Sequence, residues 1–176
     1  MVIGDALRRC ALNYPNKIAV RDYYGVHYSQ GFSYTYEELF ETVNRLANGF
    51  ASLGIQKGDR VAVQTGTGMG YILSLLALAK AGMIIAPISR AFMREEIIYQ
   101  IEDSGAKAFI VDADIFDEKV GKIKTELKSV NVFIGIGKDS PCDYRFNSLI
   151  KEGSPDEPGI KVQDDDVATL IYTSGT

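Results

Sequence analysis

The chain contains 176 residues, of which 46% are hydrophobic, and its 19 basic and 23 acidic side chains give a net charge of −4. The hydrophobic content and low net charge exclude a mainly disordered protein, and the acidic balance argues against nonspecific binding to nucleic acid or anionic membranes. The sequence contains no run of the roughly 20 apolar residues that span a bilayer and no export signal at its start, so we expect a cytoplasmic protein.

Cysteine and histidine, which often carry catalysis or bind metals, are scarce. Cys10 and Cys142 lie far apart, with no second pair to complete a metal site, so we expect two reduced thiols. His27 is the only histidine, and no nucleophile signature lies beside it, which argues against a Ser-His-Asp or Cys-His triad. We therefore predict no metal ligand and no catalytic residue among these two cysteines and the histidine.

The first predicted elements are a short helix and a hairpin. The helix covers residues 3–12, and Pro15 stops it. Residues 17–24 and 28–34 then predict two paired strands across Gly25. The tyrosines of this hairpin could form a nucleic-acid stacking platform, but they lack interleaved basic residues. Packing on a twisted hairpin is the favoured interpretation.

The next helix shows clear signals at both ends. Thr35 and Glu38 have the spacing of a capping box, in which the hydroxyl and the carboxylate each accept from an otherwise unpaired amide. A single apolar stripe follows, formed by Leu39, Val43, Leu46, Phe50 and Leu53. Gly54 is the predicted left-handed residue after the helix.

From residue 60 onward, apolar strands alternate with helices. The predicted strands cover residues 61–64, 83–87, 108–111 and 132–136, and the predicted helices cover residues 71–81, 94–103 and 115–127. Strands that are apolar throughout and separated by helices are typical of a parallel sheet buried on both faces. The predicted fold is therefore α/β, with a layered, mostly parallel sheet and helices on both faces.

Residues 138–166 have a different composition, rich in proline, glycine, serine and acidic residues, and we predict a linking segment with a short helix at 146–151. Its run Asp164, Asp165 and Asp166 could suggest a metal site. A solvated acidic turn is favoured, because successive carboxylates on an extended chain point in different directions. Residues 167–172 then predict a strand.

Two glycine-rich segments are candidates for phosphate binding. Gly66, Gly68 and Gly70 follow a strand as in a dinucleotide-binding fingerprint, but the third fingerprint glycine is replaced by Tyr71. The glycines are therefore interpreted as a tight turn. The second candidate places three hydroxyls and a glycine after the last predicted strand, at Thr173, Ser174, Gly175 and Thr176. Such a loop can turn amides and hydroxyls toward a phosphate chain, although it lacks the spacing of a Walker A motif.

This second segment resembles the start of the phosphate loop of adenylate-forming (AMP-binding) enzymes, which include acyl-CoA synthetases, luciferases and the adenylation domains of peptide synthetases. The resemblance covers essentially the whole chain. It includes Pro15-Asn16-Lys17-Ile18-Ala19-Val20, Thr35-Tyr36-Glu37-Glu38-Leu39, Lys57-Gly58-Asp59-Arg60-Val61, Lys80-Ala81-Gly82, Asp103-Ser104-Gly105-Ala106-Lys107 and Tyr172-Thr173-Ser174-Gly175-Thr176. Several motifs in the right order make the resemblance specific, with acyl-CoA and long-chain fatty-acid–CoA ligases the most similar subfamily.

The resemblance implies a ligase that joins a small-molecule carboxylic acid, with a fatty acid favoured, to coenzyme A through an acyl-adenylate. It implies ATP, Mg²⁺ and coenzyme A for the complete enzyme, with Thr173, Ser174, Gly175 and Thr176 at the β- and γ-phosphates. Residues 1–176 would be the N-terminal portion of the large AMP-binding domain, ending inside the phosphate loop. We accordingly expect this chain to be inactive on its own and to bind none of these molecules tightly.

Three alternatives remain open from the sequence. The chain could be a stand-alone nucleotide- or phosphate-binding module, or a non-catalytic remnant that self-associates through surfaces left exposed. It could also derive from an adenylation domain of another subfamily. We also expect the last predicted strand, residues 167–172, to lie centrally in the sheet of the complete domain.

Overall fold

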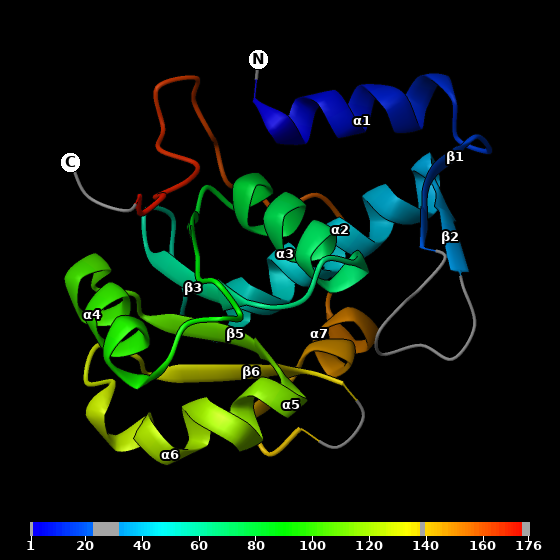
Figure 1. Cartoon of the computed structure of the whole chain (residues 1–176). Coiled ribbons are helices and arrows are strands. Elements are labelled where there is room, and N and C mark those ends of the chain that lie inside the picture. The colour runs from blue at the N-terminus through cyan, green and yellow to red at the C-terminus, as the bar shows by residue number, and fades with distance from the viewer. Residues whose placement is uncertain (1, 23–31, 138–139, 174–176) are drawn as a thin grey trace.

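The computed structural model describes residues 2–22, 32–137 and 140–173 (Figure 1). The chain begins with α1 (Ile3–Asn13), followed by β1 (Ile18–Asp22) and β2 (Phe32–Thr35), which pair antiparallel. The predicted first helix and hairpin are therefore confirmed for the part that is described. Most of the tyrosine-rich connection, including His27, lies outside the described residues.

Both end signals of the second helix are confirmed. In α2 (Tyr36–Ser52), the Thr35 hydroxyl accepts from the Glu38 amide at 3.2 Å, and the Glu38 carboxylate accepts from the Thr35 amide at 2.8 Å. Gly54 follows the helix with φ of 82°, a left-handed conformation that a residue without Cβ adopts readily. The apolar stripe of α2 faces inward, and Phe50 is fully buried.

A five-stranded sheet organises the rest of the chain. Its strands lie in the order β4-β3-β5-β6-β7, and all neighbouring pairs are parallel. Their bounds are β3 (Arg60–Gln64), β4 (Ile84–Pro87), β5 (Ala108–Asp112), β6 (Val132–Ile136) and β7 (Tyr144–Arg145). The helices between them include α3 (Met69–Lys80) and α4 (Arg94–Ser104). The predicted α/β architecture is confirmed.

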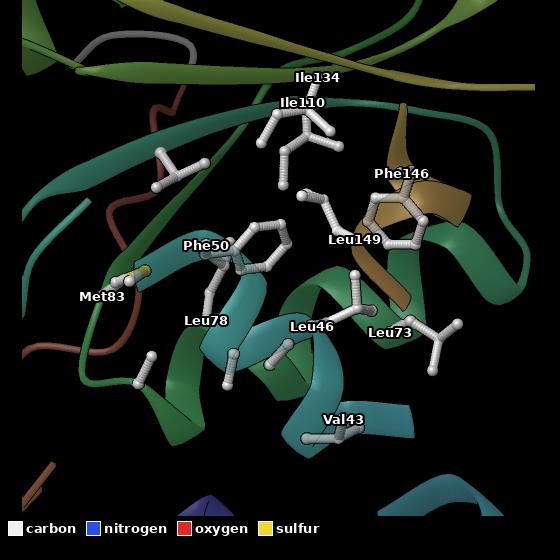
Figure 2. Packing of buried hydrophobic residues seen from close by; sticks show 14 of the residues in the cluster. Val43, Leu46, Phe50, Leu73, Leu78, Met83, Ile110, Ile134, Phe146 and Leu149 are labelled. Carbon is white, nitrogen blue, oxygen red and sulfur yellow. The ribbon is translucent and has the colours of Figure 1, made fainter. Parts of the chain in front are cut away.

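Side chains of each strand alternate between two hydrophobic cores, one on each face of the sheet. On β3, Val61 and Val63 point into the core formed with α1, α2, α3 and α7 (Phe146–Glu152), whereas Ala62 points into the core formed with α4 and the helical segment after β5. Figure 2 shows the first core, where Phe50 of α2 lies close to Phe146 of α7, with ring centroids 6.3 Å apart. Burial on both faces explains why the strands are apolar throughout.

The helix predicted at residues 115–127 is not uniform. It consists of α5 (Ala113–Ile115), a π-helical turn at Phe116–Val120, α6 (Gly121–Ile123) and a 3₁₀ turn at Lys124–Glu126. Ile115, Phe116 and Val120, in and next to the π turn, are all buried in the core that includes Phe109 and Phe133 of the sheet. Regular helical spacing in the sequence does not reveal such a turn.

Residues 140–166 contain more structure than the predicted short helix. The two-residue strand β7 adds to β6, and α7 packs on α2. The turn after α7 is fixed by side chains of α2, because Arg45 donates to the Gly153 carbonyl at 2.9 Å and Asn44 donates to the Pro155 carbonyl at 2.8 Å. None of the helices in the described part of the chain is long and apolar enough to cross a membrane.

Candidate functional site

The segment before the candidate phosphate loop does not form the predicted strand. Within residues 167–173, a single parallel bridge joins Thr169 to Ile85 of β4. The Ile85 amide donates to the Ala168 carbonyl at 3.0 Å, and the Leu170 amide donates to the Ile85 carbonyl at 2.9 Å. The strand prediction is therefore wrong. In the described structure the segment lies beside β4, at the end of the strand order, and its expected central place in the complete sheet stays a prediction.

Beyond the bridge to β4, a side chain of this segment contacts α4. The Tyr172 hydroxyl donates to the Asp103 carboxylate at 2.6 Å, near the C-terminal end of α4. The Tyr172 ring also makes an edge contact with the Tyr99 ring, with centroids 6.3 Å apart. Burial and the hydrogen bond to Asp103 raise the pKa of Tyr172 to about 12. The hydroxyl therefore remains a proton donor throughout the physiological pH range.

Thr173 is the one predicted phosphate-loop residue within the described part of the chain, and it is exposed. Ser174, Gly175 and Thr176 lie outside the described residues. An exposed threonine offers a hydroxyl and a backbone amide, the two donors that suit phosphate oxygens. The chemistry at Thr173 therefore fits the predicted role, which stays a prediction for all four residues.

The glycine turn between β3 and α3 is closed by carboxylates of the protein itself. The Gly66 amide donates to the Asp112 carboxylate at 2.7 Å, and the Met69 amide donates to the Asp22 carboxylate at 3.3 Å. Arg90 pairs with the same Asp112 oxygen. These two amides are therefore already hydrogen-bonded within the protein. The geometry thus agrees with the interpretation of these glycines as a structural turn.

We predict that replacing Asp112 with alanine lowers the free energy of unfolding by about 2 kcal/mol. The Asp112 side chain is 2% exposed, and its loss removes the acceptor of the Gly66 amide and one partner of Arg90. Urea denaturation measures the change. The matched control is Asp114→Ala, because Asp114 also pairs with Arg90 but its side chain is 47% exposed, so the expected loss is below about 0.5 kcal/mol. Equal losses for the two variants would contradict the prediction.

The acidic run is a turn, as the sequence favours. Asp166 pairs with Lys57 at 2.5 Å and accepts from the Gln163 amide at 2.6 Å. The hydrogen bond from Lys57, followed by that from Gln163, holds the pKa of Asp166 below its usual value. Across residues 2–22, 32–137 and 140–173, no group of three or more His, Cys, Asp or Glu side chains could hold a metal ion.

A cleft of about 190 Å³ lies between the start of α1, the end of α3 and residues 157–162. Lys80 lines it, with its amine 3.1 Å from the Glu157 carboxylate and 4.0 Å from the Phe40 ring centroid. Burial lowers the pKa of Lys80, and the hydrogen bond to Glu157 opposes that shift. Arg8 also pairs with Glu157 at 2.7 Å. These ion pairs join α1, α3 and the linking segment, and they leave Lys80 engaged by protein groups.

The contacts of Tyr172 with α4 have no signal in the sequence. Tyr172 and Asp103 are separated by 69 positions, so no local spacing connects them. A tyrosine next to the predicted loop, and an acidic residue near a helix end, are each too common to predict a contact.

Comparisons with known proteins agree with this fold. Residues 7–176 match the model of a family described as AMP-binding enzyme. The chain is 30% identical over 149 residues to a crotonobetaine/carnitine–CoA ligase of Citrobacter koseri, a match that covers 81% of this chain and 28% of the relative. It is 25% identical over 181 residues to a medium-chain fatty-acid–CoA ligase of Escherichia coli, and this match covers 99% of this chain and 31% of the relative.

Solved structures give the same result. A long-chain-fatty-acid–CoA ligase from Archaeoglobus fulgidus superposes with a TM-score of 0.89 over 100% of this chain and 35% of its own, and at 22% identity it supports the fold alone. A fatty acyl CoA synthetase from Mycobacterium tuberculosis, 27% identical, has a TM-score of 0.83 over 98% of this chain and 32% of its own. The chain thus spans about a third of the length of the proteins that it matches.

Proposed function

Because the chain belongs to the AMP-binding enzyme family, we propose that it is part of a ligase that activates a carboxylic acid with ATP and transfers it to coenzyme A. The support is that the similar proteins described above are CoA ligases. The names of two of them, the Escherichia coli ligase and the Mycobacterium tuberculosis synthetase, specify fatty acids or fatty acyl groups, which favours a fatty acid as the substrate class. The two free cysteines favour a cytoplasmic location.

The proposed reaction has two steps. A carboxylate oxygen attacks the α-phosphorus of ATP, the bond from the α-phosphorus to its bridging oxygen breaks, and pyrophosphate leaves with the electron pair. The thiolate of coenzyme A then attacks the acyl carbon, and AMP leaves with the electrons of the acyl–oxygen bond. The protein must stabilise negative charge on phosphate oxygens in the first step, which positioned amides and hydroxyls can do.

Within this chain, we assign the phosphate contact to Thr173, Ser174, Gly175 and Thr176. The observation that supports it is the exposed Thr173 at the end of a segment attached to both β4 and α4. The described residues offer no carboxylate cage for Mg²⁺, so no step is assigned to a metal held by this chain. A segment that spans about a third of its relatives should bind ATP weakly and catalyse neither step alone.

Nuclear magnetic resonance of the ¹⁵N-labelled chain tests this assignment. Mg-ATP and Mg-tripolyphosphate should both shift the amide signal of Thr173 with a Kd of about 1 mM or weaker, whereas adenosine should not. The double variant Thr173→Ala/Ser174→Ala should lose the response. The matched control is Thr67→Ala, which removes a hydroxyl in the glycine turn and should respond as the wild type does.

Two results would overturn the assignment. One is the absence of any shift at Thr173 at about 10 mM ATP. The other is a response confined to the turn at Gly66 and Gly68, which would make the glycine turn the phosphate site. Micromolar binding that the double variant abolishes would instead support a stand-alone nucleotide-binding module.

A further inference from the structure

The chain that leads into the candidate phosphate loop is attached at two points three residues apart. At the first, the amides and carbonyls around Thr169 bond with Ile85 of β4. At the second, Tyr172 bonds with Asp103 and packs against Tyr99, both on α4. Because Thr173 follows directly, these two attachments fix the position of the backbone at the start of the loop.

We propose that Asp103 and Tyr99 are positioning residues, which hold the start of the phosphate loop in place through Tyr172. The inference rests on the proposed function, because it assigns a role to residues that hold the loop and do not touch phosphate themselves. A phosphate loop stabilises charge only if its donors are already in position before the substrate arrives. Without the second attachment, a single bridge to β4 would leave Thr173 free to move.

The chemistry of the contact suits this role. A hydroxyl that donates to a carboxylate forms a charge-assisted hydrogen bond, which is stronger than a neutral one. The edge contact with Tyr99 restricts the Tyr172 ring independently of the hydroxyl. Asp103 lies in the last turn of α4, and the neighbouring carbonyls of Ser104 and Gly105 accept from Arg60 of β3 at 2.8 and 3.1 Å. The end of α4 that carries Asp103 is therefore hydrogen-bonded to the sheet.

Amide hydrogen exchange and four variants of the full 176-residue chain test the proposal. Tyr172→Phe keeps the ring and removes the donor, and Asp103→Ala removes the acceptor. Both should speed exchange of the Leu170 amide, which bonds with Ile85, by about fivefold, the factor expected for one lost hydrogen bond. Asp103→Asn retains an acceptor oxygen and should restore slow exchange. Tyr144→Phe, at a tyrosine that is 43% exposed on β7, is the control and should change nothing.

Titration with Mg-tripolyphosphate provides the readout that a purely structural contact would not change. The response of the Thr173 amide should weaken several-fold in Tyr172→Phe and Asp103→Ala, and remain near the wild-type response in Asp103→Asn. Unfolding midpoints that stay within error of the wild type in all variants would show that the fold itself is retained.

The outcomes separate this proposal from the assignment of function. Unchanged exchange at Leu170 in both Tyr172→Phe and Asp103→Ala overturns the positioning role, whatever the ligand does. Faster exchange together with an unchanged triphosphate response also overturns it, because the contact would then serve only the fold. If the wild type does not respond to triphosphate at Thr173, the phosphate assignment fails and this proposal fails with it, even where exchange changes as expected.

Discussion

Replacing Phe50 with alanine is expected to lower the free energy of unfolding by about 4 kcal/mol. The ring is fully buried in the core between α2, α3 and the sheet, and it packs against Phe146 of α7. Alanine would leave a cavity that helices on one side and a five-stranded sheet on the other cannot easily close. Single domains are stable by only about 5–15 kcal/mol, so this variant should lose a large share of its stability.

Urea denaturation followed by circular dichroism measures this loss. Leu12→Ala is the matched control, because Leu12 lies on α1 with 70% of its side chain exposed and should cost less than about 0.5 kcal/mol. A Phe50→Ala protein that unfolds at the same urea concentration as the wild type would show that this core is not packed as described.

The substitution Gly153→Ala should cost about 3 kcal/mol, through a steric clash. A Cβ at this position would stand 2.1 Å from the carbonyl oxygen of Arg45, which belongs to the backbone of α2. It would also lie 2.8 Å from the Leu149 carbonyl oxygen of α7. Neither helix backbone can move without disturbing its hydrogen bonds, so α7 should be pushed away from α2.

Thermal unfolding and urea denaturation both report this effect, and Gly159→Ala is the control. A Cβ at Gly159 meets nothing within 4 Å, so that variant should equal or slightly exceed the wild type in stability. If Gly153→Ala were as stable as Gly159→Ala, the close approach of α7 to α2 would be refuted.

Features that depend on local spacing could be predicted from the sequence. The capping box of Thr35 and Glu38 is visible because both partners lie within four residues, and both hydrogen bonds form as expected. The α/β layers follow from the alternation of apolar strands with helices, since a strand buried on both faces has no polar side. The parallel order of the strands agrees with the same pattern.

Features that depend on distant contacts could not be predicted. The high β propensity of Val167, Ile171 and their neighbours predicts a strand, yet this segment makes a single bridge to β4, at Thr169. The contact of Tyr172 with Asp103, 69 positions earlier, has no local signal either. Likewise, nothing near Gly153 in the sequence indicates that the backbone of α2 passes beside it.

The candidate site shows the same division. Thr173 and the residues after it were identified by their types and by resemblance to a family, and the family is confirmed. The positioning contacts with α4 emerged only from the structure. The glycine turn lacks the third fingerprint glycine in the sequence, but the two carboxylates that close it come from β1 and β5 and have no counterpart in the local pattern.

The attachment of the turn at Gly153 and Pro155 to α2 has a consequence for synthesis on the ribosome. Asn44 and Pro155 are 111 positions apart in the chain, so this contact closes a long loop and must form late. Until α7 has emerged, Phe50 lacks its partner Phe146, and part of the apolar stripe of α2 stays uncovered. The nascent chain therefore exposes part of this apolar helix face from the synthesis of Phe50 until that of Phe146, and this is the period in which a chaperone would protect it.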